Sequence, residues 1–108
     1  TDLPAILYYL KIKHKNKFYY KIGITNNNVK IRFRNEAMRK IVDYIEISYA
    51  KGKDALLIEQ IILRKYSIYI NPTNVILKDG NTEIFSIDVL GFVQLKISKK
   101  ELLKSYLQ

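Results

Sequence analysis

The sequence predicts an α+β fold in which a small antiparallel sheet is flanked by helices. Two segments with alternating apolar residues, 5–13 (AILYYLKIK) and 18–25 (FYYKIGIT), stand on either side of the polar stretch HKNK, which is typical of a β-hairpin. A third alternating segment, 44–50 (YIEISYA), predicts another strand. Apolar residues at helical spacing follow both the hairpin and the third strand. The 108 residues suffice for one domain with a single core, covering the whole chain.

The length of the hairpin loop decides which tyrosine of the first strand lies beside Lys21. A loop with an even number of residues, centred most simply on residues 15–16, sets Tyr8 opposite Gly23. Tyr8 and Lys21 then share one face of the sheet as diagonal neighbours. A change of one residue in the loop would put Tyr9 in that place instead, so both tyrosines are candidates.

The segment after the hairpin predicts a helix over residues 29–41. Three asparagines precede it, and we expect one of them to cap its first turn. Arg32 lies on a face of this helix next to the apolar stripe. That stripe consists of Val29, Phe33, Ala37 and Ile41.

The second predicted helix runs from an N-cap at Asp54 to about residue 67, and it holds Glu59 on its apolar side. The polar stripe of the same helix lies elsewhere. A carboxylate that faces a core is costly unless a cation, a hydrogen-bond network or a metal pairs with it. Glu59 is therefore either half of a structural ion pair or a functional ligand.

The last third of the chain is less regular. Pro72 interrupts the segment after the second helix, and residues 83–85 predict a short extended piece. A further helix is expected over 86–96. Ser98 begins a capping box (Ser98-Lys-Lys-Glu101) for a short final helix.

The chain is strongly basic and lacks cysteine. Nineteen Lys and Arg against ten Asp and Glu give a net charge of +9, which favours a polyanionic partner such as DNA or RNA. A generally lysine-rich composition is the alternative explanation, and the charge favours nucleic acid over it. The absence of cysteine excludes disulfides and thiolate zinc sites, and it fits a reducing intracellular compartment. No apolar run approaches the roughly 20 residues needed to cross a bilayer.

Two features of the hairpin point beyond ordinary packing. Gly23 in mid-strand weakens a sheet, which suggests close approach by another backbone or a ligand. Four tyrosines crowd the two strands, where tyrosine is favoured in any case. Aromatic side chains among basic residues are also the arrangement by which proteins stack the bases of single strands. These tyrosines are Tyr8, Tyr9, Tyr19 and Tyr20.

Taken together, these residues resemble the GIY-YIG nuclease superfamily, in particular a divergent branch from phages and large viruses whose second motif reads KIGIT. The resemblance runs from residue 6 to about residue 88, and each motif is weak unless the others accompany it in order. Ile6 stands where GIY has glycine, and Lys21 replaces the first tyrosine of YIG. The asparagine that follows the glutamate in better-known members is matched only by Asn74 or Asn81. The matching segments are Tyr8-Tyr9-Leu10, Tyr20 to Thr25, Arg32, the Asp54, Ala55 and Glu59 helix, and the pair Glu83 and Phe85.

The resemblance implies a three-stranded antiparallel sheet flanked by helices and a metal-dependent cleavage of DNA phosphodiester bonds. Tyr8 would activate the attacking water while its proton is drawn toward Lys21 or a metal-bound water. Arg32 would hold the scissile phosphate. Glu59 would bind one Mg²⁺ or Mn²⁺ ion. Supporting roles would fall to Tyr20 and Gly23.

Other functions fit the same residues. A non-catalytic nucleic-acid-binding module on this fold gives no reason for a carboxylate beside a phosphate site, and a protein-interaction domain would leave the positive charge without a use. No separate DNA-recognition domain is visible. Target specificity is therefore expected to be low, or to come from a missing segment or a partner protein. The protein itself is expected inside the cell, in the cytoplasm or nucleus of the host.

Overall fold

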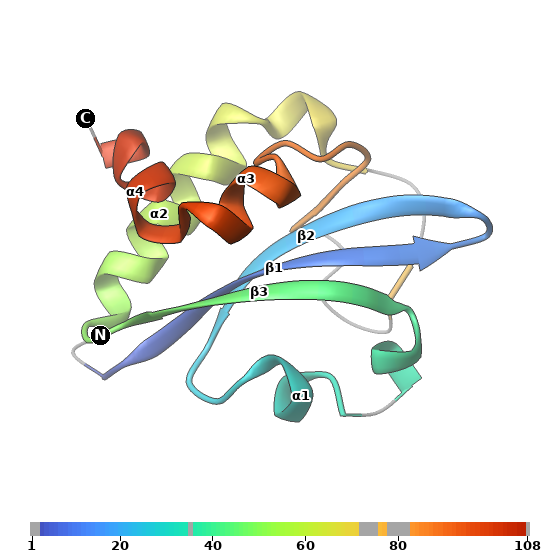
Figure 1. Ribbon diagram of the computed structural model, residues 1–108, viewed down its shortest axis with the longest axis horizontal. Coiled ribbons are helices and arrows are strands. Elements are labelled where there is room, and N and C mark those ends of the chain that lie inside the picture. Colours follow the sequence, from blue (N-terminus) through green and yellow to red (C-terminus); the bar gives the residue numbers. More distant parts are fainter. Residues whose placement is uncertain (1–2, 35, 72–75, 78–82, 108) are drawn as a thin grey trace.

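The computed structural model describes residues 3–34, 36–71, 76–77 and 83–107, arranged in three layers (Figure 1). A twisted sheet forms the middle layer. Helices α2 (Gly52–Lys65), α3 (Phe92–Ile97) and α4 (Lys99–Lys104) cover one face, and the short helix α1 (Val29–Arg32) lies on the other. We call these two sides of the sheet the α2 face and the α1 face. The predicted α+β class is thus confirmed.

The sheet is antiparallel and has the strand order β3-β1-β2-β4. Its three long strands are β1 (Ala5–His14), β2 (Lys17–Thr25) and β3 (Ile41–Tyr49). The fourth strand, β4 (Ile84–Phe85), has only two residues and pairs with Tyr20 and Lys21 of β2. It adds one short strand to the three that were expected, at the extended piece predicted near residue 84.

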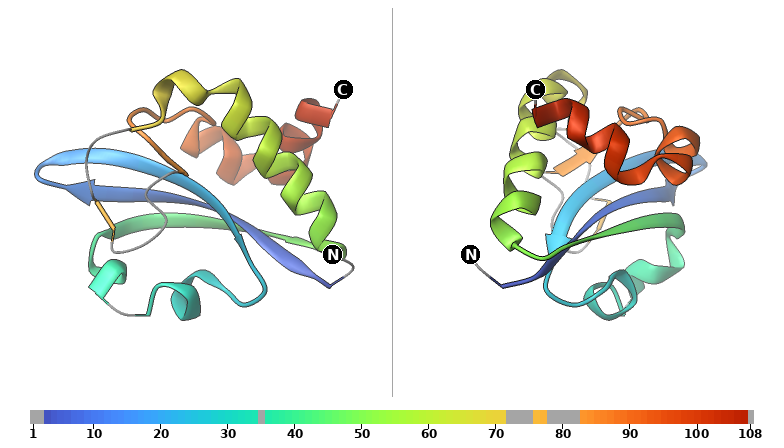
Figure 2. Two further views of the ribbon diagram at one scale, coloured as in Figure 1. Left: turned by 180° about the vertical axis from the view of Figure 1, so that it is seen from behind. Right: turned by 60° about the vertical axis from the view of Figure 1, so that its left-hand side comes forward.

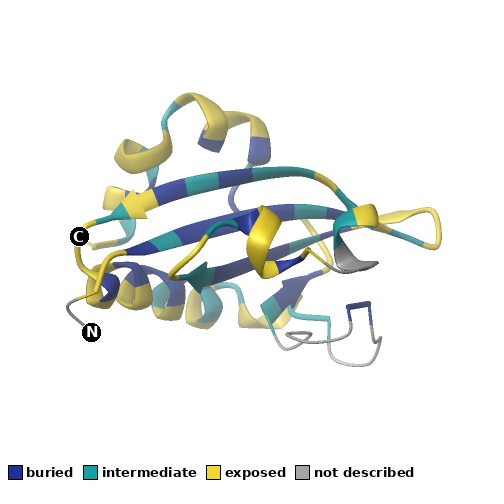
Figure 3. Cartoon of the chain, turned by 90° about the horizontal axis from the view of Figure 1, so that it is seen from below, coloured by how far each residue is buried: buried dark blue, intermediate teal, exposed yellow. Residues whose placement is uncertain are grey.

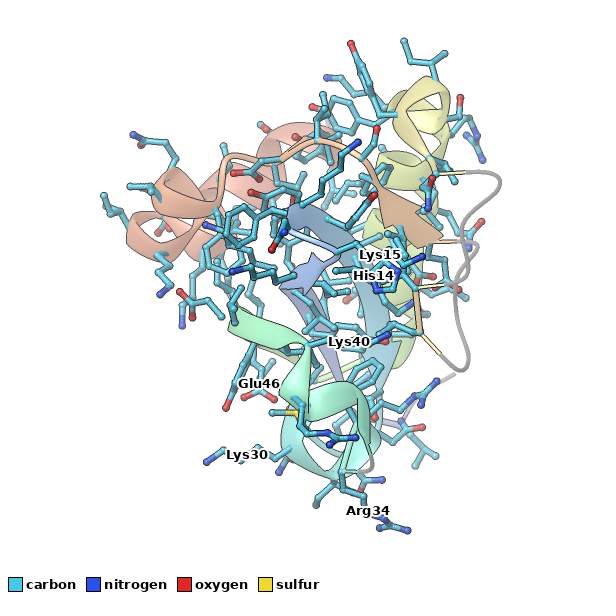
Figure 4. All side chains as sticks on the ribbon, turned by 90° about the vertical axis from the view of Figure 1, so that its right-hand side faces the viewer. His14, Lys15, Lys30, Arg34, Lys40 and Glu46 are labelled. Carbon is cyan, nitrogen blue, oxygen red and sulfur yellow. The ribbon has the colours of Figure 1, made fainter. Side chains whose placement is uncertain are left out.

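The β1–β2 hairpin turns through Lys15 and Asn16, as the two-residue loop requires. Both residues have positive φ, at 49° and 66°. Such angles are typical of the turn whose twist matches that of the flanking strands, and asparagine tolerates them well. The resulting register places Tyr8 opposite Gly23, which confirms the even-loop prediction. The hairpin end, marked by His14 and Lys15, projects beyond the helices (Figures 1 and 4).

The helix after the hairpin is much shorter than predicted, so the expectation of a helix over 29–41 was wrong. α1 ends at Arg32, and a 3₁₀ turn, η1 (Glu36–Arg39), follows before β3 begins at Ile41. Ile41 pairs with Ile12 of β1. The helical spacing of apolar residues is therefore overridden by a long-range strand pairing that a local pattern does not reveal.

Two side chains fix the start of α1. The Asn28 side chain accepts a hydrogen bond from the Ile31 amide (2.9 Å), which confirms that one of the three asparagines is the cap. A Glu46 carboxylate oxygen of β3 accepts another from the Val29 amide (2.7 Å), and Figure 4 shows Glu46 beside α1. The helix is thus tied to the sheet at its first turn.

The second helix has the predicted position but a different start. α2 begins at Gly52 rather than after Asp54, and its N-cap is Lys51, whose side chain makes no capping bond. Asp54 lies in the first turn of the helix, where a carboxylate is favoured by the helix dipole. A 3₁₀ turn, η2 (Ser67–Tyr69), follows the helix.

The third helix was also predicted too long. α3 starts only at Phe92, because Gly91 adopts a left-handed conformation (φ 75°) at its N-cap. The Asp88 carboxylate accepts hydrogen bonds from the amides of Gly91 (3.1 Å) and Phe92 (2.7 Å). α4 follows Ser98 as predicted, although the Ser98 side chain makes no capping bond, and the 3₁₀ turn η4 (Ser105–Leu107) comes last.

Alternation along the strands divides the core into two clusters, one on each face of the sheet, and Figure 3 shows this burial pattern. Tyr8 belongs to the α1-face cluster and Tyr9 to the α2-face cluster. Within the described ranges, no helix is long and apolar enough to cross a membrane. The α1-face cluster includes Leu10, Ile12, Val29, Phe33, Ile76 and Ile84, and the α2-face cluster includes Leu7, Ile22, Ile45, Ile58, Ile62 and Phe85.

Candidate functional site

Two charged side chains are buried in the described part of the chain, and both were predicted as site residues. Lys21 is 1% exposed and Glu59 is 6% exposed. The inward position that the helical pattern predicted for Glu59 is therefore confirmed. An ion taken out of water requires a partner of opposite charge or good hydrogen bonds. The surroundings of these two groups thus define a site.

Lys21 is accompanied by Glu83, the residue just before β4. The Lys21 Nζ atom lies 3.8 Å from a carboxylate oxygen of Glu83. Burial lowers the pKa of the Lys21 ammonium, the Glu83 charge opposes that shift, and the positive charge of Arg32 adds to it. Burial therefore outweighs the carboxylate, and the Lys21 amine gives up its proton more readily than an exposed lysine.

Glu59 lies beside Glu83, so that two carboxyl groups meet at one place. Burial, and after it the negative charge of Glu83, raise the pKa of Glu59 to about 7. Lys21 and a hydrogen bond from the Gln60 amide (3.4 Å) act in the opposite direction. The two carboxyl groups are hydrogen-bonded to each other, which requires a proton between them. A cation could take the place of that proton.

These groups come together at the outer edge of β2. β4 pairs with β2 only at Tyr20 and Lys21, so it stops short of Gly23. Glu83 arrives on the segment that leads into β4, while Glu59 arrives from α2, which packs over β1 and β2 (Figure 2). Three elements far apart in the sequence thus place their charges around the middle of β2.

Tyr8 joins the site from the neighbouring strand, and Gly23 makes room for it. A Cβ atom added to Gly23 would lie 2.3 Å from the Tyr8 hydroxyl oxygen, so any side chain at this position would force the tyrosine ring to move. The Tyr8 side chain thus makes the close approach to Gly23 in this structure. Phe33 packs edge-on against the other side of the site tyrosine, with ring centroids 5.4 Å apart. The ring is held from both sides.

Ionisable side chains surround the Tyr8 hydroxyl. Burial raises its pKa, Arg32 opposes the rise, and Glu83 and Glu59 add to it. Among the residues that the structure describes, the hydroxyl has no hydrogen-bond partner. Arg32 itself is exposed at the end of α1, with its guanidinium carbon 5.0 Å from the centre of the Phe33 ring. An accessible cation thus stands next to a buried phenol.

Tyr9 and Tyr20 lie on the opposite, α2 face. The Tyr9 hydroxyl donates to Asp88 (2.8 Å), and its ring stacks on Tyr20 at 5.9 Å. The register thus places Tyr8, and not Tyr9, on the face of Lys21. The supporting residue Tyr20 is not brought together with the other predicted site residues, because successive residues of a strand point to opposite faces.

Sequence reasoning left out Glu83 as a site residue, although the Glu-x-Phe pair was noted. The signal that could have found it is Lys21, whose burial requires a nearby carboxylate. Glu46, which holds α1 in place, lies opposite Tyr8 in β3 and becomes evident only once that pairing is known. Asn74 and Asn81 lie outside the described residues.

Glu59 and Glu83 are the residues that could hold a metal ion. No cluster of three or more His, Cys, Asp or Glu side chains is present within the described ranges. Mg²⁺ nevertheless keeps several waters and is commonly held by one or two carboxylates. Two adjacent carboxyl groups that must otherwise share a proton suit such a hard divalent ion, so the donor set fits.

Comparisons of the chain with protein-family models, curated proteins and solved structures give no match. The resemblance to the GIY-YIG superfamily rests on the motifs quoted above.

Proposed function

We propose that the chain is a metal-dependent endonuclease of the GIY-YIG type that hydrolyses phosphodiester bonds of DNA. The observation that carries this proposal is the cluster of Lys21, Glu59 and Glu83 next to the Tyr8 hydroxyl. Buried groups whose pKa values are shifted in opposite directions are typical of catalytic sites. Here a lysine has a lowered pKa and a glutamate a raised one.

In this proposal Glu59 and Glu83 hold one Mg²⁺ or Mn²⁺ ion in their deprotonated forms. The bound ion would supply neutralisation of the charge that develops on the phosphate during cleavage. Glu83 has a second contact, because one of its carboxylate oxygens lies 3.8 Å from the Lys21 Nζ atom. The two carboxylates thus link the ion to the amine.

Tyr8 receives the proton of the attacking water and passes its own proton on. A phenol whose pKa is raised by burial keeps its proton at neutral pH, so it acts only if that proton leaves as the new one arrives. The Lys21 amine can accept it in its neutral form, and burial favours that form because it lowers the Lys21 pKa. Tyr8 and Lys21 lie diagonally on one face, where side chains of this size reach each other.

Arg32 binds the scissile phosphate. Its guanidinium is exposed and lies close enough to Tyr8 and Lys21 to affect the pKa of both. A forked donor at the open side of a buried site is suited to a phosphate that arrives from solvent. The net charge of +9 would hold the rest of the DNA backbone. Target choice would then rest with a further segment or a partner protein.

A non-catalytic nucleic-acid-binding module is the second candidate, favoured by the same basic charge. In that case the Glu59 and Glu83 pair would repel phosphate and would have no catalytic ion to hold. The pair is the feature that separates the two functions.

Incubation with supercoiled plasmid and Mg²⁺ or Mn²⁺ tests the proposal. We expect nicked or linear product with the wild-type protein and none with EDTA or with Glu59→Gln. Glu101→Gln, which removes an exposed carboxylate of α4, is the matched control and should cut normally. Intact plasmid that shifts on a gel at every metal concentration would favour the binding module instead.

A further inference from the structure

The α2 face carries a second feature, at the hairpin end of the sheet, that the proposed nuclease chemistry does not use. A cleft of about 420 Å³ opens there, within the size range of small-molecule sites. Aromatic side chains of β2 and α3 form much of its lining, together with lysines from β1 and α3. These residues are Phe18, Tyr20, Phe92, Lys11 and Lys96.

Phe18 is the most unusual residue of this cleft. It is 46% exposed, although it is a large apolar side chain on a strand. The Lys11 ammonium lies over one face of its ring, 4.4 Å from the ring centre. Tyr20, two residues along the same face, is stacked on Tyr9 and so is fixed in place. A rigid aromatic ring thus stands beside a more open one.

The described lining of the cleft has two lysines and two aspartates, and the positive charge that favours a polyanion lies on the adjoining hairpin. Residues 3–35 contain no acidic residue and eight Lys or Arg, four of them in or beside the hairpin turn region at positions 11, 13, 15 and 17. The two acidic residues at the cleft are occupied by the protein itself. Asp43 pairs with Lys96 and accepts from the Tyr44 amide (2.8 Å), while Asp88 accepts from the Tyr9 hydroxyl (2.8 Å).

We propose that this cleft is a stacking site for unpaired bases of a single-stranded nucleic acid. Phe18 supplies the ring on which a base stacks, and the hairpin lysines contact the phosphates on either side. A duplex is excluded as the occupant because its base faces are covered by neighbouring bases. The proposal rests on the nucleic-acid binding in the proposed function and deepens it. Because the cleft lies on the α2 face, whereas Tyr8 and Lys21 lie on the α1 face, the substrate would carry an unpaired segment next to the bond that is cut.

Binding of fluorescein-labelled oligo-dT in EDTA tests the stacking site. Phe18→Ala should weaken binding of a 20-nucleotide strand roughly tenfold, the size expected for loss of one base–aromatic stack. An abasic strand of equal length, which keeps the phosphates and lacks bases, should bind both proteins within about twofold. Ile68→Ala, at a site that is 83% exposed and distant from the cleft in sequence, is the matched control. An equal loss of affinity for both strands, or no loss, would overturn the proposal.

A second variant keeps the test decisive if Phe18→Ala is poorly folded. The chain contains no tryptophan, so Phe18→Trp introduces a single fluorophore at the cleft. Its emission should be quenched by oligo-dT and not by the abasic strand. Unquenched emission would contradict stacking. A different result would also contradict it: the wild-type protein sediments as a dimer in ultracentrifugation, Phe18→Ala is a monomer, and oligo-dT binding is unchanged. The cleft would then be a contact between two copies.

The outcome is separable from that of the nuclease proposal. Plasmid cleavage by the wild-type protein together with unchanged oligo-dT binding in Phe18→Ala would overturn the stacking site alone. Base-dependent binding lost in Phe18→Ala, in a protein that cuts nothing, would support the stacking site and count against the nuclease.

Discussion

Tyr8 and Tyr9 are neighbours in β1 and almost equally buried, at 3% and 2% exposed, yet their hydroxyl groups lie in different chemical surroundings. The Tyr9 hydroxyl donates to Asp88, whose carboxylate also binds two amides at the start of α3. The hydrogen-bond donors to this carboxylate are therefore one hydroxyl and two backbone amides, all of them uncharged. The Tyr8 hydroxyl lies near Arg32 and near the carboxyl pair, whose members repel each other.

The difference separates two reasons for burying a polar group. Around Tyr9 each donor meets an acceptor, and the network holds α3 against the sheet. Around Tyr8 two carboxyl groups lie side by side, where burial and the Glu83 charge raise the Glu59 pKa, and the amine has a lowered pKa. An arrangement that is incomplete without a proton or a cation is suited to binding and catalysis rather than to stability.

Removal of each hydroxyl in turn sharpens this comparison most. Tyr8→Phe should reduce plasmid cleavage by about 10²- to 10⁴-fold, the usual contribution of a general base. Its thermal stability should stay unchanged, because no hydrogen bond to a described residue is lost. Tyr9→Phe should cleave normally and lose about 1–3 kcal/mol of unfolding free energy, because the partly buried Asp88 carboxylate loses one of its donors and the Leu90 amide loses its acceptor. Equal activities in the two variants would remove the functional distinction between the tyrosines.

Two arginines of the α1 region offer a matched pair. Arg32→Ala should lower cleavage by about 10²- to 10³-fold, the size associated with loss of one group that stabilises transition-state charge. Arg34 is exposed two residues later, and Figure 4 shows it pointing away from the protein. Arg34→Ala should therefore change cleavage by less than about threefold through general electrostatics. Steady-state kinetics on one labelled duplex would show whether the two losses differ.

The dependence of stability on pH tests the carboxyl pair without any substrate. The Glu59 pKa is raised from 4.5 to about 7, so between these values the folded protein keeps a proton that the unfolded chain releases. Unfolding free energy should therefore fall as pH rises through this range, by up to about 3 kcal/mol from this group. Urea titrations in EDTA at pH 5 and pH 8 measure the change. In Glu59→Gln the fall should be smaller by that amount, and an unchanged pH dependence would contradict a raised pKa.

The contact between Gly23 and Tyr8 predicts the smallest effect. Gly23→Ala should cost about 1–3 kcal/mol, because the new methyl group overlaps the tyrosine ring and forces it to move. In a Tyr8→Leu background the same change should cost much less, since the ring is gone. A full cost in both backgrounds, measured by urea unfolding, would show that the glycine serves another purpose.

The parts of this site that local pattern determines could be predicted from the sequence. The two-residue turn and the alternation of β1 and β2 determine the register that puts Tyr8 opposite Gly23. The helical spacing around Glu59 determines that it faces inward. Both follow from neighbours within a few residues.

The parts that depend on distant pairing could not. α1 ends early because Ile41 pairs with Ile12, a contact that the helical spacing of 29–41 does not reveal. Glu83 reaches Lys21 only because Ile84 pairs with that lysine across a two-residue strand, more than sixty residues away in the chain. Its contribution to the site was therefore visible only in the fold.

Titration of the metal-free protein with Mn²⁺, followed by calorimetry, tests the central claim that Glu59 and Glu83 form one cation site. We predict one bound ion per chain at pH 8, weaker binding at pH 6 because the shared proton competes, and loss of binding in both Glu59→Gln and Glu83→Gln. The Glu101→Gln control should bind as the wild-type protein does. Unchanged affinity in either glutamate variant would contradict the account, because the buried pair would then have no role in holding an ion.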